Sequence, residues 1–373
     1  MVYVLPHVCP TSSKLFPPGL TSKLDNLIGV HMKQSLAARG ILSAAVFTLL
    51  LLPVVATAQD VSNSPYVVTG ETGSVHIYPT PEMTRQIMAQ PGPQVPGALT
   101  YHGGPIMTGL NLYAIFWVPV PAKLQNGKPT GLTTKYESVA KQFLADYPYH
   151  GIANNSTQYY STKTGVNTYF VGIGALVASV VDTDPYPASG CTDPATPGNC
   201  ITDAQLRTEI AKVMKAHGWT PGLNKIYIVF TSTGEGSCMN GASCAYTQYC
   251  AYHGYFGSAT NPTIYANQPY ADPKYCYASF APYYQHAPSG DIASDANVNV
   301  TSHEITEATT DPELNAWWDT ANGEEIGDLC GWHFGGSAGD WDGGLANQRW
   351  NGHYYDLQLE YDNHTASCVK VGP

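Results

Sequence analysis

A short run in the last third of the chain combines one histidine with several carboxylates at helical spacing. The run SHEITEATTDP, residues 302–312, contains His303, Glu304, Glu307 and Asp311. Residues four apart share one face of a helix, so His303 and Glu307 point the same way, and Asp311 follows one turn later if the helix persists. Imidazole and carboxylate groups both bind divalent cations. We therefore predict a metal site on this helix.

The roles of these residues follow from the H-E-x-x-H motif, in which two histidines hold zinc and the glutamate between them activates water. Here Glu304 occupies the position of the general base, and Glu307 replaces the second histidine. A carboxylate can bind zinc. One histidine with several carboxylates also suits harder ions. The predicted cofactor is a divalent metal, zinc in the first place, with calcium or manganese as alternatives.

A third ligand is expected downstream, in the acidic stretch NGEEIGDLC. Glu325 lies 22 positions after His303, and Asp328 lies 25 positions after it, beside Cys330. We prefer Asp328 and keep Glu325 as the second choice, because a disulfide at Cys330 would hold Asp328 in place. Asp319, after a pair of tryptophans, is also within reach.

A purely structural interpretation of the same residues stays open. Glu304 and Glu307 would lie in the first turns of a helix expected over about 297–310, where the helix dipole stabilises negative charge by ~0.3–1 kcal/mol. Thr301 or Ser302 would cap that helix, and His303 would be a buried histidine with its hydrogen bonds satisfied. Ser232, Ser237 and His253 indicate no catalytic triad, because no G-x-S-x-G pattern surrounds either serine.

The elements around this helix predict an α/β (α+β) fold with a twisted mixed sheet. Strands are expected over 110–120, within 167–181 and over 225–232, and a helix is expected in the run TTKYESVAKQFLADY. A second helix begins with a capping box of Thr202 and Gln205 and ends at Gly218. Strand–helix alternation without an internal repeat favours one globular domain over 97–373. The order of elements is also that of zincin metalloproteases, which is an analogy of fold.

The N-terminal part predicts export. Residues 32–58 have a basic start, an apolar centre and small residues at Ala56 and Ala58, the layout of a cleaved signal peptide. Residues 1–31 are interpreted as an upstream extension outside the native start, and the Pro/Gly-rich residues 59–96 as a flexible leader. The apolar run is short for a retained membrane span, and no other apolar run is long enough to cross a membrane.

Cysteine and charge content agree with an exported protein. Eight cysteines follow the expected cleavage site, an even number that predicts up to four disulfides whose pairing the sequence leaves open. The net charge is −11. That balance argues against nucleic acid, which needs a clustered basic surface. The cysteines are Cys191, Cys200, Cys238, Cys244, Cys250, Cys276, Cys330 and Cys368.

Several stretches in the same order resemble the Exordium, or phosphate-induced protein, family. They are YHGGPI (101–106), GLNKIYIVFTSTGEGSC with the following CAYHGY, VTSHEITEATTDPELNAWWD and GEEIGDLCGW. The resemblance runs from about residue 98 to the C-terminus and implies a secreted or cell-wall-associated protein, linked in plants to growth. A glutamate at the position of Glu307 belongs to that family's pattern. The chain departs from it by a longer insertion around 183–201 and by the Trp317–Trp318 pair.

Two functions remain as hypotheses. In the first, the protein is a secreted metal-dependent hydrolase that acts on an extracellular peptide, with His303, Glu307 and Asp328 on the metal and Glu304 as the base. In the second, it is a non-catalytic extracellular protein that binds a cell-wall polymer or another protein, with a structural metal or none.

Overall fold

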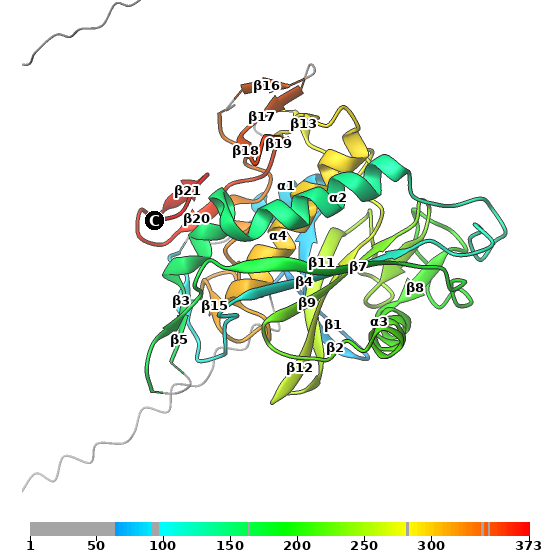
Figure 1. Cartoon of the computed structure of the whole chain (residues 1–373), viewed down its shortest axis with the longest axis horizontal. Helices are drawn as coiled ribbons and strands as arrows, with labels where there is room; N and C mark the ends of the chain where they lie inside the picture. The colour runs from blue at the N-terminus through cyan, green and yellow to red at the C-terminus, as the bar shows by residue number, and fades with distance from the viewer. Residues whose placement is uncertain (1–63, 91–96, 163–164, 281–282, 337–338, 342–343) are drawn as a thin grey trace, which may run out of the picture. The chain divides into compact units, whose positions relative to one another are not determined.

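A seven-stranded mixed sheet forms the centre of the computed structural model (Figure 1). The structure describes residues 64–90, 97–162, 165–280, 283–336, 339–341 and 344–373, all within the compact unit of residues 57–373. The expected extension and signal peptide lie outside the described residues. The strands of the sheet, in spatial order, are β1 (Val67–Gly70), β2 (Gly73–Pro79), β11 (Tyr249–Ser258), β12 (Asn261–Gln268), β9 (Lys225–Thr231), β4 (Leu110–Trp117) and β7 (Gly174–Asp182).

One half of the sheet is parallel and the other half antiparallel. β12, β9, β4 and β7 run parallel, whereas β12, β11, β2 and β1 alternate in direction. The inner parallel strands are nearly continuous apolar runs such as KIYIVFT, because both of their faces are covered. The predicted α/β class with a mixed sheet is therefore confirmed.

Helices cover both faces of the sheet. On one face, Leu206 and Ile210 of α3 (Asp203–His217) pack in a cluster with Ile115 of β4. On the other, α2 (Thr134–Asp146) and α4 (Ile292–Thr310) share a cluster with Leu112 and Phe116. Figure 1 shows α2 and α4 running together, with α3 on the other side of the sheet. Alternate residues of β4 thus supply two separate cores.

Short elements make up the rest of the described chain. Helix α1 spans Pro81–Met88, and short 3-10 helices span Tyr147–Tyr149, Gly151–Gln158 and Asp328–Cys330. Two-stranded ladders pair β3 (Thr100–Tyr101) with β15 (Trp317–Trp318), β5 (Tyr160–Ser161) with β6 (Thr168–Tyr169), β8 (Cys200–Thr202) with β10 (Gly236–Cys238), β13 (Ser279–Phe280) with β14 (Tyr283–Tyr284), β16 (Gly339–Trp341) with β17 (Gly344–Ala346), β18 (Gln348–Trp350) with β19 (His353–Tyr355), and β20 (Glu360–Asp362) with β21 (Ser367–Val369).

The helix that carries the sequence motif starts earlier than predicted. α4 begins at Ile292, and every residue after Ile292 is buried. Glu304 and Glu307 therefore lie in its later turns, so stabilisation by the N-terminal helix dipole, which fades within the first turn, does not explain them. Thr301 and Ser302 are interior residues and do not cap the helix. The start was missed because ASDANVNVTS has no amphipathic stripe.

The interpretation of residues 59–96 as a leader is wrong for the part that the structure describes. Residues 67–79 form β1 and β2, and β2 lies inside the sheet between β1 and β11. Val75, Ile77 and Tyr78 are core residues. The proline- and glycine-rich composition of the whole segment concealed one short alternating strand, GSVHIYP. Residues 59–63 and 91–96 lie outside the described residues.

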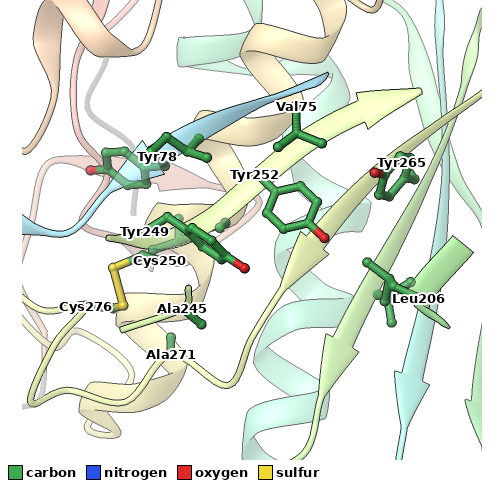
Figure 2. Close-up of a cluster of buried hydrophobic side chains, with 14 of the residues drawn as sticks. Val75, Tyr78, Leu206, Ala245, Tyr249, Cys250, Tyr252, Tyr265, Ala271 and Cys276 are labelled. Carbon is green, nitrogen blue, oxygen red and sulfur yellow. A yellow bond between two sulfur atoms is a disulfide. The ribbon is translucent and has the colours of Figure 1, made fainter. Parts of the chain in front are cut away.

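The four disulfides pair cysteines that are close in sequence. The pairs are Cys191–Cys200, Cys238–Cys244, Cys250–Cys276 and Cys330–Cys368. Figure 2 shows the Cys250–Cys276 bond beside the buried Tyr249, with Tyr252 and Tyr265 farther along the same cluster. The predicted disulfide framework is confirmed, and its pairing comes from the structure. Within the described residues, no helix has both the length and the apolarity that a membrane crossing requires.

Candidate metal centre

Side chains from four separate elements meet between α4 and the sheet. His303, Glu304 and Glu307 come from α4, His76 from β2 and His253 from β11. Glu325 and Asp328 come from the acidic loop before Cys330. His76 and His253 are direct partners on neighbouring antiparallel strands, so they point to the same face. Their rings stack at 5.7 Å between centroids.

The helix motif has the geometry that its spacing predicted. His303 Nε2 lies 3.0 Å from Glu307 Oε2 and 3.8 Å from Asp328 Oδ1. Bonds of about 2.0–2.2 Å to one cation place two ligands within about 4.4 Å of each other. The three residues that we preferred as ligands are thus brought together, and their binding of a metal stays a prediction.

His76, which the sequence analysis missed, contacts both downstream acids. Its Nε2 lies 2.6 Å from Asp328 Oδ2, and its Nδ1 lies 3.0 Å from Glu325 Oε1. Burial alone would lower the pKa of His76, but Glu325 and Asp328 outweigh burial and raise it well above its ordinary value. This ring is therefore positioned either as an imidazolium between two carboxylates or as a metal ligand oriented by one of them.

His253 holds the opposite side of the centre. Its Nδ1 lies 3.2 Å from Glu304 Oε2 and 3.7 Å from Glu307 Oε2, and its Nε2 lies 3.8 Å from Glu325 Oε2. Burial lowers the pKa of His253 well below its ordinary value, and repulsion from His76 and His303 adds to the effect. The ring is therefore neutral, which leaves one nitrogen free to accept a proton or a metal bond.

Gln358, in the tail before β20, sets the tautomer of His303. Its Oε1 accepts from the Trp332 backbone N–H, and its Nε2 lies 2.9 Å from both the Gly327 carbonyl oxygen and His303 Nδ1. Since Nε2 of an amide only donates, His303 Nδ1 is an acceptor, and the neutral ring carries its proton on Nε2. That proton faces Glu307. Burial lowers the pKa of His303 to about 3, which keeps the ring neutral.

Two other predicted acids have structural partners. Asp311 Oδ1 accepts from the backbone N–H groups of Asn315 and Ala316 at 2.6 and 2.7 Å, which closes the turn after α4. Asp319 accepts from the backbone of Asn322 and Glu324 and braces the acidic loop. Neither contacts the three histidines within the distances that define ion pairs in the described structure.

Burial makes the charge of the centre costly. Glu304 and Glu307 are fully buried, and Asp328 is 7% exposed. Burial raises the pKa of Glu304 well above its ordinary value, with repulsion by Glu307 adding to the effect. Burial raises the pKa of Glu307 to about 7, although His76 and the backbone amides of Asp328 and Gly327 lower it. In the described part of the chain, the ion pairs of these acids are all with histidine.

Many polar atoms of the centre have no hydrogen-bond partner of acceptable geometry. Buried polar groups are nearly always paired, and an unpaired one costs about 1–3 kcal/mol. The unpaired atoms of the four histidine-facing acids and two of the histidines are His253 Nε2, His303 Nε2, Glu304 Oε1, Glu307 Oε1 and Oε2, Glu325 Oε2 and Asp328 Oδ1. Two sets of donor atoms each lie within 4.8 Å of one another, His76–Glu307–Asp328 and His253–Glu304–Glu307. The donor chemistry and these unpaired atoms fit a divalent cation.

A pocket of about 480 Å³ lies beside this centre and has Asp328 in its lining, although the Asp328 side chain itself is fully buried. Its lining combines apolar residues of α1, including Met83 and Ile87, with Glu324 and Asp328 of the acidic loop. Tyr66 separates pocket and centre, because it stacks near His76 and donates to Glu324 Oε1 at 3.1 Å. Asp328 thus belongs both to the pocket wall and to the buried cluster.

Sequence reasoning missed His76, His253 and Gln358 for different reasons. His76 lies in the supposed leader, and His253 lies in the aromatic run CAYHGY, where only a serine triad was considered. Gln358 carries no motif at all. The one available signal was alternation: His76 and His253 follow the period-2 pattern of strands that pair side by side.

Comparison with known proteins identifies two curated relatives. The chain is 25% identical to Protein EXORDIUM-like 5 of Arabidopsis thaliana over 267 residues, which cover 65% of this chain and 66% of that protein. It is 38% identical to Protein EXORDIUM-like 3 of the same plant over 65 residues, which cover 16% of this chain and 19% of that protein. The chain thus spans less than two thirds of each relative. No family model matches, and no solved structure matches.

Proposed function

We propose that the chain, whose curated relatives are Exordium-like proteins, is a secreted metal-dependent hydrolase of the Exordium family. The observation that carries the proposal is the buried set of unpaired carboxylate and imidazole atoms between α4 and the sheet. Four disulfides are consistent with export. The long helix against a mixed sheet supports a zincin-like arrangement by analogy only.

The first cation is assigned to His76 Nε2, Glu307 and Asp328. Glu325 accepts from His76 Nδ1 and orients the ring, the usual arrangement for a metal-binding histidine. His303 Nε2 lies 3.0 Å from Glu307 Oε2, so the ring packs against that carboxylate. A bound divalent cation supplies a Lewis acid that polarises a substrate carbonyl and lowers the pKa of water.

Glu304 is assigned the role of general base. Its Oε2 lies 3.2 Å from His253 Nδ1, which leaves Oε1 unpaired and directed into the centre. A buried carboxylate with a raised pKa is a stronger base than an exposed one. His253 holds the side chain so that this oxygen accepts the proton of the attacking water.

The pocket supports a substrate with an apolar side chain. Met83, Ile87 and Met88 of α1 form its apolar wall, and Asp328, a residue of the centre, is also part of its lining. The proposed extracellular substrate is therefore a peptide rather than a cell-wall polymer, since a sugar chain would need more hydrogen-bonding side chains along this wall.

The second candidate is a non-catalytic extracellular protein with a structural metal. It is favoured by the burial of the centre, because His253, His303, Glu304 and Glu307 have no exposed surface. Structural metal sites are closed, whereas catalytic sites keep one position open to substrate.

Elemental analysis together with the Glu304→Gln variant tests the proposal. We expect the purified protein to contain stoichiometric metal, and E304Q to keep at least one ion while peptide hydrolysis falls about 10²-fold or more. The control is Glu235→Gln, a buried carboxylate outside the centre, which should keep both metal and activity. Metal without hydrolysis in the unmodified protein would favour the second candidate. Absence of metal would reject both assignments.

A further inference from the structure

A second set of ligand atoms lies beside the first and shares Glu307 with it. His253 Nδ1 lies 3.2 Å from Glu304 Oε2 and 3.7 Å from Glu307 Oε2. Ligands of one zinc or manganese ion lie within about 4.4 Å of each other when each bond is about 2.0–2.2 Å. These three atoms therefore have the spacing expected for ligands of one ion. That ion would be separate from the one at His76 and Asp328.

Charge balance points to more than one divalent cation. Four buried carboxylates, Glu304, Glu307, Glu325 and Asp328, face the histidines, and no Lys or Arg is paired with any of them in the described structure. One divalent cation neutralises two carboxylates, whereas two neutralise four. Each uncompensated buried charge costs several kcal/mol. With a single ion, the remaining charge has to be neutralised by the His76 imidazolium and by protons on the acids, whereas a second ion neutralises it directly.

The unpaired atoms are distributed over both sets. Asp328 Oδ1 belongs to the first set, Glu304 Oε1 to the second, and both oxygens of Glu307 are unpaired. Glu307 belongs to both sets of donor atoms, and its Oε2 lies 3.7 Å from His253 Nδ1 of the second set. A carboxylate with two unpaired oxygens between two ligand sets is positioned to bridge two ions.

We propose that the centre binds two divalent cations bridged by Glu307, the first at His76 and Asp328 and the second at His253 and Glu304. The inference rests on the proposed metal-dependent function and extends it to a second ion. Glu304 would bind through Oε2, the oxygen nearer His253, and keep Oε1 as the proton acceptor. In known two-metal sites the ions lie about 3.5–4 Å apart and clamp both sides of the reacting group.

The number of metal ions bound by the full protein tests the second ion separately from the proposed metal-dependent function. The apoprotein is titrated with zinc chloride, and bound zinc is counted by elemental analysis after desalting. Two equivalents are expected. No bound zinc, nor manganese in a parallel titration, would reject the proposed function itself. One equivalent would keep that function and reject the second ion.

Variants locate each ion independently of activity. His253→Phe keeps the ring shape and removes the nitrogens, so it should lower the stoichiometry from two to one. Asp328→Asn should weaken the other ion, and Glu235→Gln should leave two. If a variant folds poorly, the unmodified protein loaded with manganese still tests the inference. Two bridged Mn²⁺ ions in that protein would give a spin-coupled signal. A magnetically isolated signal at two equivalents would overturn the bridge through Glu307.

Discussion

His303 is the residue for which structure changes the chemical interpretation most. Its position in H-E-x-x-E suggests a metal ligand, yet the Gln358 amide donates to Nδ1 and leaves the proton on Nε2. Histidines that bind a metal through Nε2 normally carry their other proton on Nδ1 and donate it outward. His76 has that arrangement, because Glu325 faces its Nδ1. We therefore propose His76, a histidine on a strand, as the ligand, and metal binding by His303 stays a prediction.

Gly327 provides a test of how tightly this arrangement is packed. A Cβ added at Gly327 would lie 2.5 Å from His303 Nδ1 and 2.9 Å from Glu307 Oε1. The backbone there has ordinary helical angles, so the cost of Gly327→Ala comes from this contact alone. We expect G327A to lower the free energy of unfolding by about 1–3 kcal/mol and to weaken metal binding by at least tenfold, as measured by chemical denaturation and zinc titration.

Gly241→Ala is the matched control for this prediction. Gly241 is exposed, and an added Cβ there would have nothing within 4 Å. G241A should change neither stability nor zinc affinity. If G327A behaved like G241A, the close packing of Gly327 against His303 and Glu307 would be refuted.

At the scale of elements, α4 is a polar helix in a buried position. Its residues Ser294, Asn297, Thr301 and Thr306 are as buried as Val298 and Ile305. A helix of this kind is held by tertiary contacts and by some side-chain hydrogen bonds, and not by an amphipathic stripe. Thr306 illustrates this, because its hydroxyl bonds to Tyr147 at 2.6 Å and to the Ser302 carbonyl at 2.8 Å. The helix that holds His303, Glu304 and Glu307 is thus the one without an amphipathic pattern in its sequence.

Helix α3 has the opposite character, and its ends follow from sequence. Thr202 accepts from the Gln205 backbone, Gln205 reaches back to the Thr202 N–H, and Gly218 ends the helix in the left-handed conformation. We expect Thr202→Ala to destabilise the protein by about 1 kcal/mol, as measured by urea denaturation.

Thr208→Ala on the same helix serves as its control. Thr208 is exposed, and its hydroxyl bonds only to the Ala204 carbonyl one turn back. Removal of such a bond from a helix interior should be neutral or slightly stabilising. Equal losses in both variants would mean that the capping box contributes nothing specific.

For the whole molecule, buried acids outside the centre make stability depend on pH. Burial raises the pKa of Glu235 to about 8 and that of Asp356 to about 8, from ordinary values near 4. The folded state therefore holds these protons more tightly than the unfolded state does. The contribution of these two groups to the free energy of unfolding is greatest below about pH 4.5 and is lost as the pH rises through about 8. These groups oppose the acid unfolding that most proteins show.

Glu235→Gln should flatten this dependence. The substitution keeps the shape of the side chain and removes the charge that forms as pH rises. Relative to the unmodified protein, we expect E235Q to gain on the order of 3 kcal/mol between pH 5 and 9, measured by denaturation midpoints across that range. Glu71→Gln in the exposed β1–β2 turn should show no such gain. A pH-independent difference for E235Q would contradict the burial of an ionisable Glu235.

Local pattern was sufficient where local interactions decide structure. The strand KIYIVFT, the capped helix α3, the even set of eight cysteines and the acids at Glu307 and Asp328 were all found from residue type and spacing. The start of α4 was not found because it has no amphipathic stripe, and β2 was not found because the proline- and glycine-rich composition around it concealed its short alternation. Both are positioned by partners far away in the chain.

The sequence by itself determined the class of fold, the disulfide content and the five residues of the candidate centre on α4 and the acidic loop, because these depend on periodicity, composition and spacing. Only the tertiary structure decided which histidines face the carboxylates. His76 and His253 are 177 positions apart and meet through the pairing of β2 with β11. Gln358 reaches His303 from a tail without any motif. Contacts of this kind depend on how sheet and tail pack around α4, and no short-range pattern encodes them.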